Sequence, residues 1–254
     1  TGAPAEGMWR RLLDTMTARR VPFCVVLGNH DSEQDLSRQQ IGRIVTSYPG
    51  SLNALDAAGE LADRELEILG SGSRRPAWLL DSHSESLLEG IDGYDWFRPE
   101  QVAWLRDRCT ARRTANGGRA VPSLAFFHIV LPEYLAAWRN PSNTHIGRAA
   151  EAECPGALNT GMFAAMVESG SVMGTFVGHD HDIDYLVADK GVCLGYGRFS
   201  GDNTTYNNLR PGVRLLLLTE GERGFETWIR EDDGRMVDHA RFAEGKITEI
   251  AVER

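Results

Sequence analysis

Cysteine is scarce in this sequence. Its 254 residues include four cysteines, at positions 24, 109, 154 and 193, and no two of them form a Cys-x-x-Cys pair. So sparse a set excludes a disulfide-built scaffold. Cys24 and Cys193 lie in apolar runs, which is typical of buried thiols, whereas a disulfide between Cys109 and Cys154 stays open.

Long apolar runs and excess positive charge are also lacking. No stretch approaches the roughly 20 apolar residues of a membrane-spanning helix, so we expect no span in this chain. Lys and Arg number 27 against 36 Asp and Glu, which gives a formal net charge of −9. We therefore expect no nucleic-acid partner, because non-specific binding of that polyanion needs basic surface. A bound metal could supply the local positive charge that an anionic substrate needs.

The remaining composition is that of an ordinary globular protein. Hydrophobic residues make up 42% and charged residues 25% of a chain long enough for a sizeable core. We expect one domain over residues 1–254. The sequence begins with Thr1 and shows no signal peptide, which leaves a secreted, periplasmic or cytoplasmic location open.

Helical and strand-like patterns alternate along the chain. Helical spacing of apolar residues predicts helices over 5–19 and 34–47, one beginning at Pro99, and one around residues 162–167. Apolar runs predict strands over 23–27, 65–69, 76–81, 124–130, 172–177, 192–199, 213–220 and 225–231, with a loop over 139–158. The mixture predicts an α/β or α+β layered fold. Residues 23–27 are apolar throughout, so we expect a central strand covered on both faces by helices or a second sheet.

Three of the apolar runs end in polar residues suited to bind a metal ion. They lead into Gly28-Asn29-His30-Asp31, into His128, and into Gly178-His179-Asp180-His181. Sites in open α/β sheets form outside the C-terminal ends of strands, so we expect these residues to meet there. Imidazole is the commonest metal ligand, and amide or carboxylate oxygens complement it for Mn, Fe or Zn.

A plainer interpretation exists for each residue taken alone. A single histidine at a strand end is usually a satisfied polar side chain, and Asp31 could be a turn or helix N-cap residue. Three strand ends that all carry such residues favour a metal site. His83, His145 and His239 lie elsewhere, and we expect surface or loop positions for them.

In their order along the chain, these motifs resemble the last three motifs of the calcineurin-like metallophosphoesterases. The surrounding segments Leu36-Ser37-Arg38, Gly93-Tyr94-Asp95-Trp96, Phe126-Phe127-His128-Ile129, Leu131-Pro132-Glu133 and Asn159-Thr160-Gly161 resemble the purple-acid-phosphatase-like branch. The resemblance covers about residues 5 to 235. It implies two β-sheets flanked by helices, and hydrolysis of a phosphate ester at two metal ions.

The resemblance implies roles for particular residues. Asn29, His128 and His179 would bind one metal ion and His181 the other. His30 would contact the phosphate and assist the leaving oxygen, with Asp31 orienting its ring. The two metal ions, of the Fe, Mn or Zn kind, would clamp the phosphate and activate a hydroxide. Arg148 is the candidate substrate contact in the long loop, and we expect specificity from residues 139–160 and 200–210, with Tyr206.

One departure from the family is visible. Its two earlier motifs, Asp-x-His and Gly-Asp, do not occur before Asn29, so we expect the sequence to begin after the first two strands of a longer domain. Asp81-Ser82-His83 imitates the first motif but follows the Gly-Asn-His-Asp segment, where a surface or capping role is expected.

The resulting hypothesis is a metal-dependent phosphoesterase that hydrolyses phosphate monoesters. Its substrate would be a small molecule or a phosphoprotein. Two alternatives stay open, a phosphodiesterase with the same chemistry and a non-catalytic module that binds a phosphate or a partner.

Overall fold

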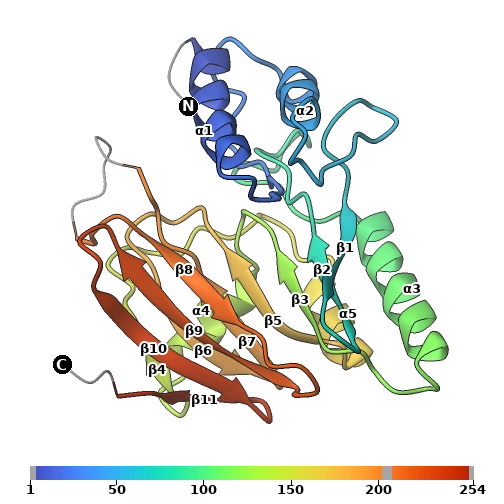
Figure 1. Ribbon diagram of the computed structural model, residues 1–254, viewed down its shortest axis with the longest axis vertical. Helices are drawn as coiled ribbons and strands as arrows, with labels where there is room; N and C mark the ends of the chain where they lie inside the picture. The colour runs from blue at the N-terminus through green and yellow to red at the C-terminus, as the bar shows by residue number, and fades with distance from the viewer. Residues whose placement is uncertain (1–3, 202–207, 252–254) are drawn as a thin grey trace.

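A mixed β-sheet of seven strands lies at the centre of the part that this computed structural model describes, residues 4–201 and 208–251 (Figure 1). Its order is β1-β2-β3-β5-β7-β6-β4. The strands are β1 (Arg64–Leu69), β2 (Arg74–Leu79), β3 (Ser123–Phe126), β4 (His145–Ile146), β5 (Val172–Val177), β6 (Leu186–Asp189) and β7 (Val192–Tyr196). Strands β2, β3, β5 and β7 are parallel to one another. Their C-terminal ends therefore lie along one edge of the sheet.

A second sheet packs on one face of the first. Within the described residues it has four antiparallel strands in the order β11-β10-β9-β8, which are β8 (Gly212–Leu217), β9 (Gly224–Glu231), β10 (Met236–Ala243) and β11 (Lys246–Glu249). Figure 1 shows this orange and red layer in front of the larger sheet. Leu124 and Phe176 of the larger sheet pack with Phe225 and Phe242 of the smaller one. The sandwich interior is thus apolar.

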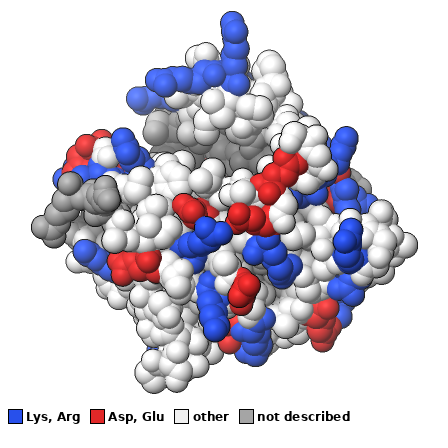
Figure 2. Space-filling view, turned by 60° about the horizontal axis from the view of Figure 1, so that its bottom comes forward, with Lys and Arg blue, Asp and Glu red and all other residues white. Residues whose placement is uncertain are grey.

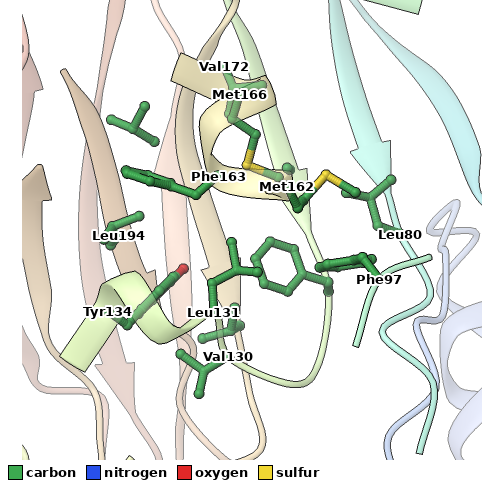
Figure 3. Close-up of a cluster of buried hydrophobic side chains, with 14 of the residues drawn as sticks. Leu80, Phe97, Val130, Leu131, Tyr134, Met162, Phe163, Met166, Val172 and Leu194 are labelled. Atoms are coloured by element: carbon green, nitrogen blue, oxygen red, sulfur yellow. The ribbon is translucent and has the colours of Figure 1, made fainter. Parts of the chain in front are cut away.

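Helices cover the other face of the large sheet. The described residues form α1 (Ala5–Ala18), α2 (Arg38–Thr46), α3 (Pro99–Ala115), α4 (Pro132–Arg139) and α5 (Met162–Ser169). Side chains of α3, α4 and α5 form one core with the sheet, part of which Figure 3 shows around Tyr134, Met162 and Met166. Because successive strand residues point to opposite faces, Ala125 lies in this core and Leu124 in the other.

The N-terminal helices form a separate small core. Trp9 and Leu13 of α1 pack with Ile41 and Val45 of α2, above the strand ends in Figure 1. Helix α2 begins after a capping box, in which the Ser37 hydroxyl accepts from the Gln40 amide and the Gln40 side chain accepts from the Ser37 amide. The helix expected over 34–47 therefore begins four residues later, at the residue after the cap.

The layered fold predicted from the sequence is confirmed, and so is the strand Val172–Val177. The predicted strand at residues 23–27 is wrong. Phe23 makes only an isolated bridge to Ser51, and the backbone of Val25 bonds the side chain of Asn53. Cys24 and Val26 instead line an apolar cavity of about 490 Å³, and no described strand pairs with them. Apolar composition predicted the burial, but a strand also needs a backbone partner.

Smaller expectations also have outcomes. All four cysteines are free, so the possible disulfide between Cys109 and Cys154 is absent. The loop expected at 139–158 contains the short strand β4, and helix α4 precedes it. None of the helices in the described ranges is long and apolar enough to span a membrane. Figure 2 shows basic and acidic side chains next to one another over one face, so that face has no large area of one sign.

Candidate metal-binding cavity

The ends of three parallel strands and one preceding turn enclose a cavity of about 270 Å³. The residues that line it come from the segments after residue 27 and after β3, β5 and β7, namely Gly28, His30, Asp31, His128, Gly178, His179, Asp180, His181, Ile183, Tyr196, Gly197, Arg198 and Phe199. The parallel order of the sheet explains why segments so far apart in sequence meet here.

Three side chains converge at the wall of this cavity. Oδ1 of Asn29 lies 3.0 Å from Nε2 of His128 and 3.1 Å from Nδ1 of His179. Asn29 is only 3% exposed. The structure thus brings three of the four predicted ligands together, and His181 lines the same cavity.

Two glycines make room for the His128 ring. A Cβ at Gly28 would lie 2.7 Å from Cε1 of His128, and one at Gly178 would lie 3.3 Å from its Nδ1. The amide of Gly28 also donates to Oδ2 of Asp31 at 2.8 Å. Asp31 therefore closes the turn that presents Asn29, while Ser37 caps the next helix.

Burial keeps the two converging histidines neutral. Removal from water, and next the neighbouring His179, lower the pKa of His128 to about 3. Removal from water, and next His181, lower the pKa of His179 to about 4. Neutral imidazoles carry a lone pair for a metal ion at physiological pH.

Nδ2 of Asn29 and Nε2 of His179 are buried and have no hydrogen-bond partner among the described residues. Oδ1 of Asn29 accepts from one ring nitrogen of each histidine. In its other tautomer a neutral imidazole turns a lone pair toward the same point, where the amide oxygen also offers one. Over the described ranges no three His, Cys, Asp or Glu side chains could hold a metal ion together. The trio here qualifies through its amide oxygen, and it fits a cation.

The loop that carries His179 is held in an unusual conformation. His179 has φ +73, a left-handed conformation that a residue with a side chain rarely adopts. The Tyr94 ring packs edge-on against it, with centroids 4.2 Å apart. The next residue, Asp180, accepts from the Tyr196 hydroxyl at 2.6 Å and from the Cys154 amide at 3.0 Å. The contacts of Tyr94 and Asp180 thus hold the loop on both sides of the His179 backbone.

His30 has a different carboxylate partner from the one expected. Its Nδ1 lies 2.6 Å from Oε1 of Glu33, whereas Asp31 bonds the Gly28 amide. The carboxylate at the His30 ring in this structure is thus that of Glu33, and an orienting role for Asp31 stays a prediction. A carboxylate three residues further along reaches the ring because residues 29–35 form a turn and a bend. No motif in the sequence indicated Glu33.

Other predicted residues lie away from the cavity. Arg148 is exposed and is not among the lining residues, although its amide donates to Asp184. The Asp81 carboxylate pairs with Arg38, and His83 contacts Gln101. Tyr206 lies outside the described residues. The long loop does approach the site, since Cys154 bonds Asp180 and Glu151 bonds the Asp182 amide.

The geometry is that of a layered α/β protein with imidazole and amide groups converging at the C-terminal edge of its parallel strands. No protein-family model matches the chain. Several named proteins are similar to it in sequence. The chain is 32% identical to the probable inactive purple acid phosphatase 29 of Arabidopsis thaliana, over 85% of this chain and 62% of that protein. It is 29% identical to the phosphatase DCR2 of Saccharomyces cerevisiae, over 89% of this chain and 42% of that protein.

A third relative and one solved structure are also similar. The probable inactive purple acid phosphatase 28 of Arabidopsis thaliana is 27% identical, over 84% of this chain and 60% of that protein. The crystal structure of a dimetal phosphatase from Danio rerio aligns with a TM-score of 0.48 and 15% identity, over 94% of this chain and 89% of that one. The chain thus spans less than two thirds of the length of the curated relatives described here.

The named relatives confirm the resemblance of this chain to the purple-acid-phosphatase-like branch of the calcineurin-like metallophosphoesterases. Two of these relatives carry the word inactive in their names, so the resemblance indicates a class of protein without defining an activity.

Proposed function

We propose that this chain is part of a metal-dependent phosphoesterase that hydrolyses phosphate monoesters. The observation that carries the proposal is the convergence of Asn29 Oδ1 with His128 Nε2 and His179 Nδ1, at 3.0 and 3.1 Å. The resemblance to a phosphatase family supports it.

Four side chains of this chain would bind metal ions. Asn29, His128 and His179 would hold one metal ion of the Fe, Mn or Zn kind, and His181 would contribute to a second. When bound, two such ions would neutralise the charge of a phosphate ester and activate water for attack. Of these four residues only His181 would bind the second ion. That ion would therefore need ligands other than these four residues.

His30 would act on the leaving group. It lines the cavity, and the Glu33 carboxylate at Nδ1 fixes the orientation of its ring. We propose that His30 donates a proton to the leaving oxygen, a role in general acid catalysis.

Substrate selection would fall to the long loop. Its residues 151–154 contact the loop of His179 and His181 through Cys154 and Glu151. Arg148 stays a proposed contact for the substrate, which would reach it outside the cavity. The same clamp would serve a phosphodiesterase, so the shape that this loop gives to the entrance would decide between monoester and diester.

A non-catalytic module is the second candidate. The names of two relatives favour it, since both are called inactive. Such a protein would bind phosphate or a phosphorylated partner in the same cavity without turnover.

The test measures metal content and activity on one set of variants. Wild type, His128→Ala and His145→Ala are loaded with Mn, Fe or Zn, and metal is counted by mass spectrometry after desalting. Hydrolysis of p-nitrophenyl phosphate, a monoester, and of bis-p-nitrophenyl phosphate, a diester, is measured on the same samples. His145 is the matched control because it is an exposed residue of β4 that packs against Trp138 and is not among the residues that line the cavity.

The expected result is loss of metal and of monoester turnover in His128→Ala, with both retained in His145→Ala. Equal metal content in His128→Ala and wild type would reject the ligand assignment. Metal uptake and binding of inorganic phosphate without hydrolysis of either ester would favour the non-catalytic module.

A further inference from the structure

The segment after β2 lies behind two of the proposed ligands. Its sequence Asp81-Ser82-His83 imitates a metal motif, yet none of the three residues lines the cavity. Ser82 is 1% exposed, which is unusual for a serine outside a regular element. A buried hydroxyl needs hydrogen-bond partners, and those of Ser82 belong to the segment that carries His128.

Ser82 holds the backbone at His128. Its Oγ accepts from the amide of Ile129 at 2.8 Å and from the amide of His128 at 3.3 Å. No other acceptor bonds these two amides among the described residues. Without the hydroxyl, two buried donors would lose their acceptor, and the backbone under His128 would be free to shift.

Ser84 holds the backbone at Asn29. Its Oγ donates to the carbonyl oxygen of Asn29 at 3.0 Å. Two serines of one short segment thus bond the backbones of Asn29 and His128, which lie 99 positions apart in the chain. Oδ1 of Asn29 and Nε2 of His128 are 3.0 Å apart at the cavity wall.

We propose that Ser82 and Ser84 are positioning residues that set the separation of Asn29 Oδ1 and His128 Nε2, and so the affinity of the site for a metal ion. The inference rests on the proposed function for the identity of the ligands. It assigns no contact with metal or substrate to either serine.

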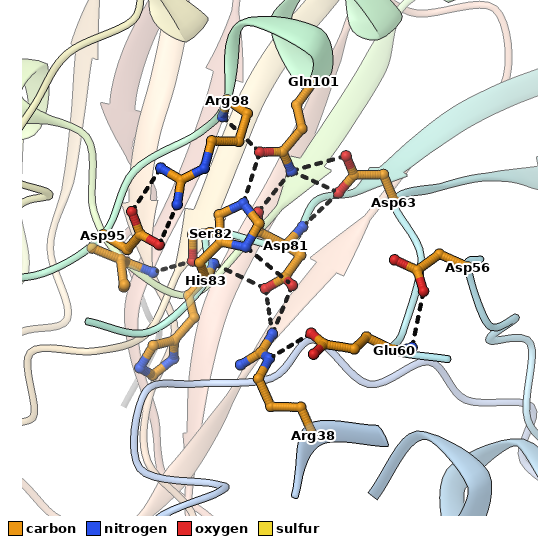
Figure 4. Close-up of polar contacts among 12 residues, drawn as sticks. Arg38, Asp56, Glu60, Asp63, Asp81, Ser82, His83, Asp95, Arg98 and Gln101 are labelled. Carbon is orange, nitrogen blue, oxygen red and sulfur yellow. Dashed lines mark hydrogen bonds and ion pairs between the residues drawn. The ribbon is translucent and has the colours of Figure 1, made fainter. Parts of the chain in front are cut away.

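The segment is itself rigidly anchored, as Figure 4 shows. The amide of Asp81 donates to Asp63 at 2.7 Å, and its carbonyl accepts from Gln101 of α3 at 2.8 Å. Its carboxylate takes both bonds from Nη2 of Arg38 on α2, at 2.6 and 2.7 Å. Three parts of the fold therefore anchor Asp81, the residue that precedes Ser82, and an anchored segment is what a support for precise ligand spacing needs.

The experiment compares the full chain as wild type, Ser82→Ala, Ser84→Ala, Ser84→Thr and Ser123→Ala. Affinity for Mn²⁺ or Zn²⁺ is measured by competition with a coloured chelator, and stability without metal by thermal unfolding. Ser123 is the matched control. It is fully buried, and its hydroxyl accepts from the Trp78 indole at 2.9 Å at the start of β3, away from the cavity.

We expect a roughly 10–100-fold loss of affinity in Ser82→Ala and a smaller loss in Ser84→Ala. Ser84→Thr keeps the hydroxyl and should restore affinity, whereas Ser123→Ala should lower stability with affinity unchanged. A purely structural role would instead lower the affinity of Ser82→Ala and Ser123→Ala in proportion to their stability, and that pattern would overturn the inference. Ser84 is partly exposed, so its variants remain informative if Ser82→Ala does not fold.

Hydrogen exchange separates this inference from the proposed function. Removal of the Ser82 hydroxyl should speed exchange at the amides of His128 and Ile129 in the metal-free protein, while Ser123→Ala should not. Absence of metal uptake by wild type would reject the proposed function alone. Unchanged exchange at both amides in Ser82→Ala would overturn the positioning role whatever the metal does.

Discussion

Nε2 of His128 lies 3.0 Å from Oδ1 of Asn29, although the two residues are 99 positions apart in the chain. The ring reaches this position because Gly28, which precedes Asn29, has no side chain to block it. The position of the His128 ring thus depends on the absence of a side chain at Gly28.

Replacing Gly28 with alanine should move the His128 ring away from Asn29. The new Cβ would lie 2.7 Å from Cε1 and 2.8 Å from Nε2 of the ring, closer than such atoms normally approach. We expect metal affinity to fall by about tenfold or more, and the free energy of unfolding to fall by about 1–3 kcal/mol from overpacking. Chelator competition and urea unfolding measure the two effects.

Gly7→Ala provides the control for this change. A Cβ at Gly7 meets nothing within 4 Å, and the residue lies in α1. This variant should gain about 0.5–1 kcal/mol of stability, since glycine is unfavourable inside a helix. Its metal affinity should stay at the wild-type value. Wild-type affinity in Gly28→Ala would show that the ring does not need the space.

Strand ends were the informative part of the sequence. Residues 124–127 are apolar and alternate between two cores, and the polar His128 follows them. Strand β3 ends at Phe126, so the strand predicted over 124–130 stops shortly before this histidine. The same signal marks Val177 and the pair His179 and His181. Because parallel strands end at one edge, patterns that are local in sequence predicted a contact that is distant in sequence.

Three features could be found only in the folded chain. Residues 23–27 have the composition of a strand, but only the three-dimensional arrangement reveals that Cys24 and Val26 face a cavity of about 490 Å³ and no paired strand. The partner of His30 is Glu33 because the turn folds back, and a turn of this kind has no periodicity. The Ser82 hydroxyl likewise depends on the packing of β2 beside β3.

The ion pair of Arg38 and Asp81 should contribute more to stability than the pair of Arg10 and Glu6. The first two side chains are 13% and 15% exposed and the second two are both 51% exposed. Arg38→Ala would leave the Asp81 carboxylate without its cation, at a cost of about 3 kcal/mol, the lower end for a buried pair.

Arg10→Ala should change the free energy of unfolding by less than about 1 kcal/mol, as is usual for exposed pairs. Urea unfolding of the two variants and of Asp81→Ala provides the comparison. Equal small losses in Arg38→Ala and Arg10→Ala would mean that water reaches the first pair as freely as the second.

Asp238 should give the protein a stability component that falls as pH rises. Burial, and next the neighbouring Asp184, raise the pKa of its carboxyl to about 6. The folded state therefore binds its proton more tightly than the unfolded state, whose pKa is near 3.9, and stability from this group is present below about pH 4 and lost through pH 6. Asp238→Asn keeps the shape and suits the φ of +52.

The variant should thus gain stability relative to wild type between pH 4 and 6, by about 1 kcal/mol because the group is partly exposed. Asp233→Asn is the control of opposite sign. The backbone amide of Arg235 holds the pKa of Asp233 below its usual range, so this carboxylate stabilises at neutral pH and loses its effect as pH falls. Parallel pH profiles of the two variants, measured by urea unfolding, would contradict both assignments.

The buried hydroxyls of Tyr134 and Thr175 tie α4 to β5 and should behave as a coupled pair. They lie 2.6 Å apart, and Tyr134 is fully buried. Tyr134→Phe leaves the Thr175 hydroxyl only its longer bond to the carbonyl oxygen of Cys193, at 3.5 Å. Thr175→Val leaves the Tyr134 hydroxyl only the carbonyl oxygens of Thr175 and Gly195, at 3.2 and 3.3 Å. We therefore expect each single change to cost about 1 kcal/mol. The double variant removes both polar groups and should cost clearly less than the sum of the two single changes. Urea unfolding of the four proteins measures the cycle, and additive costs would show that the two hydroxyls do not depend on each other.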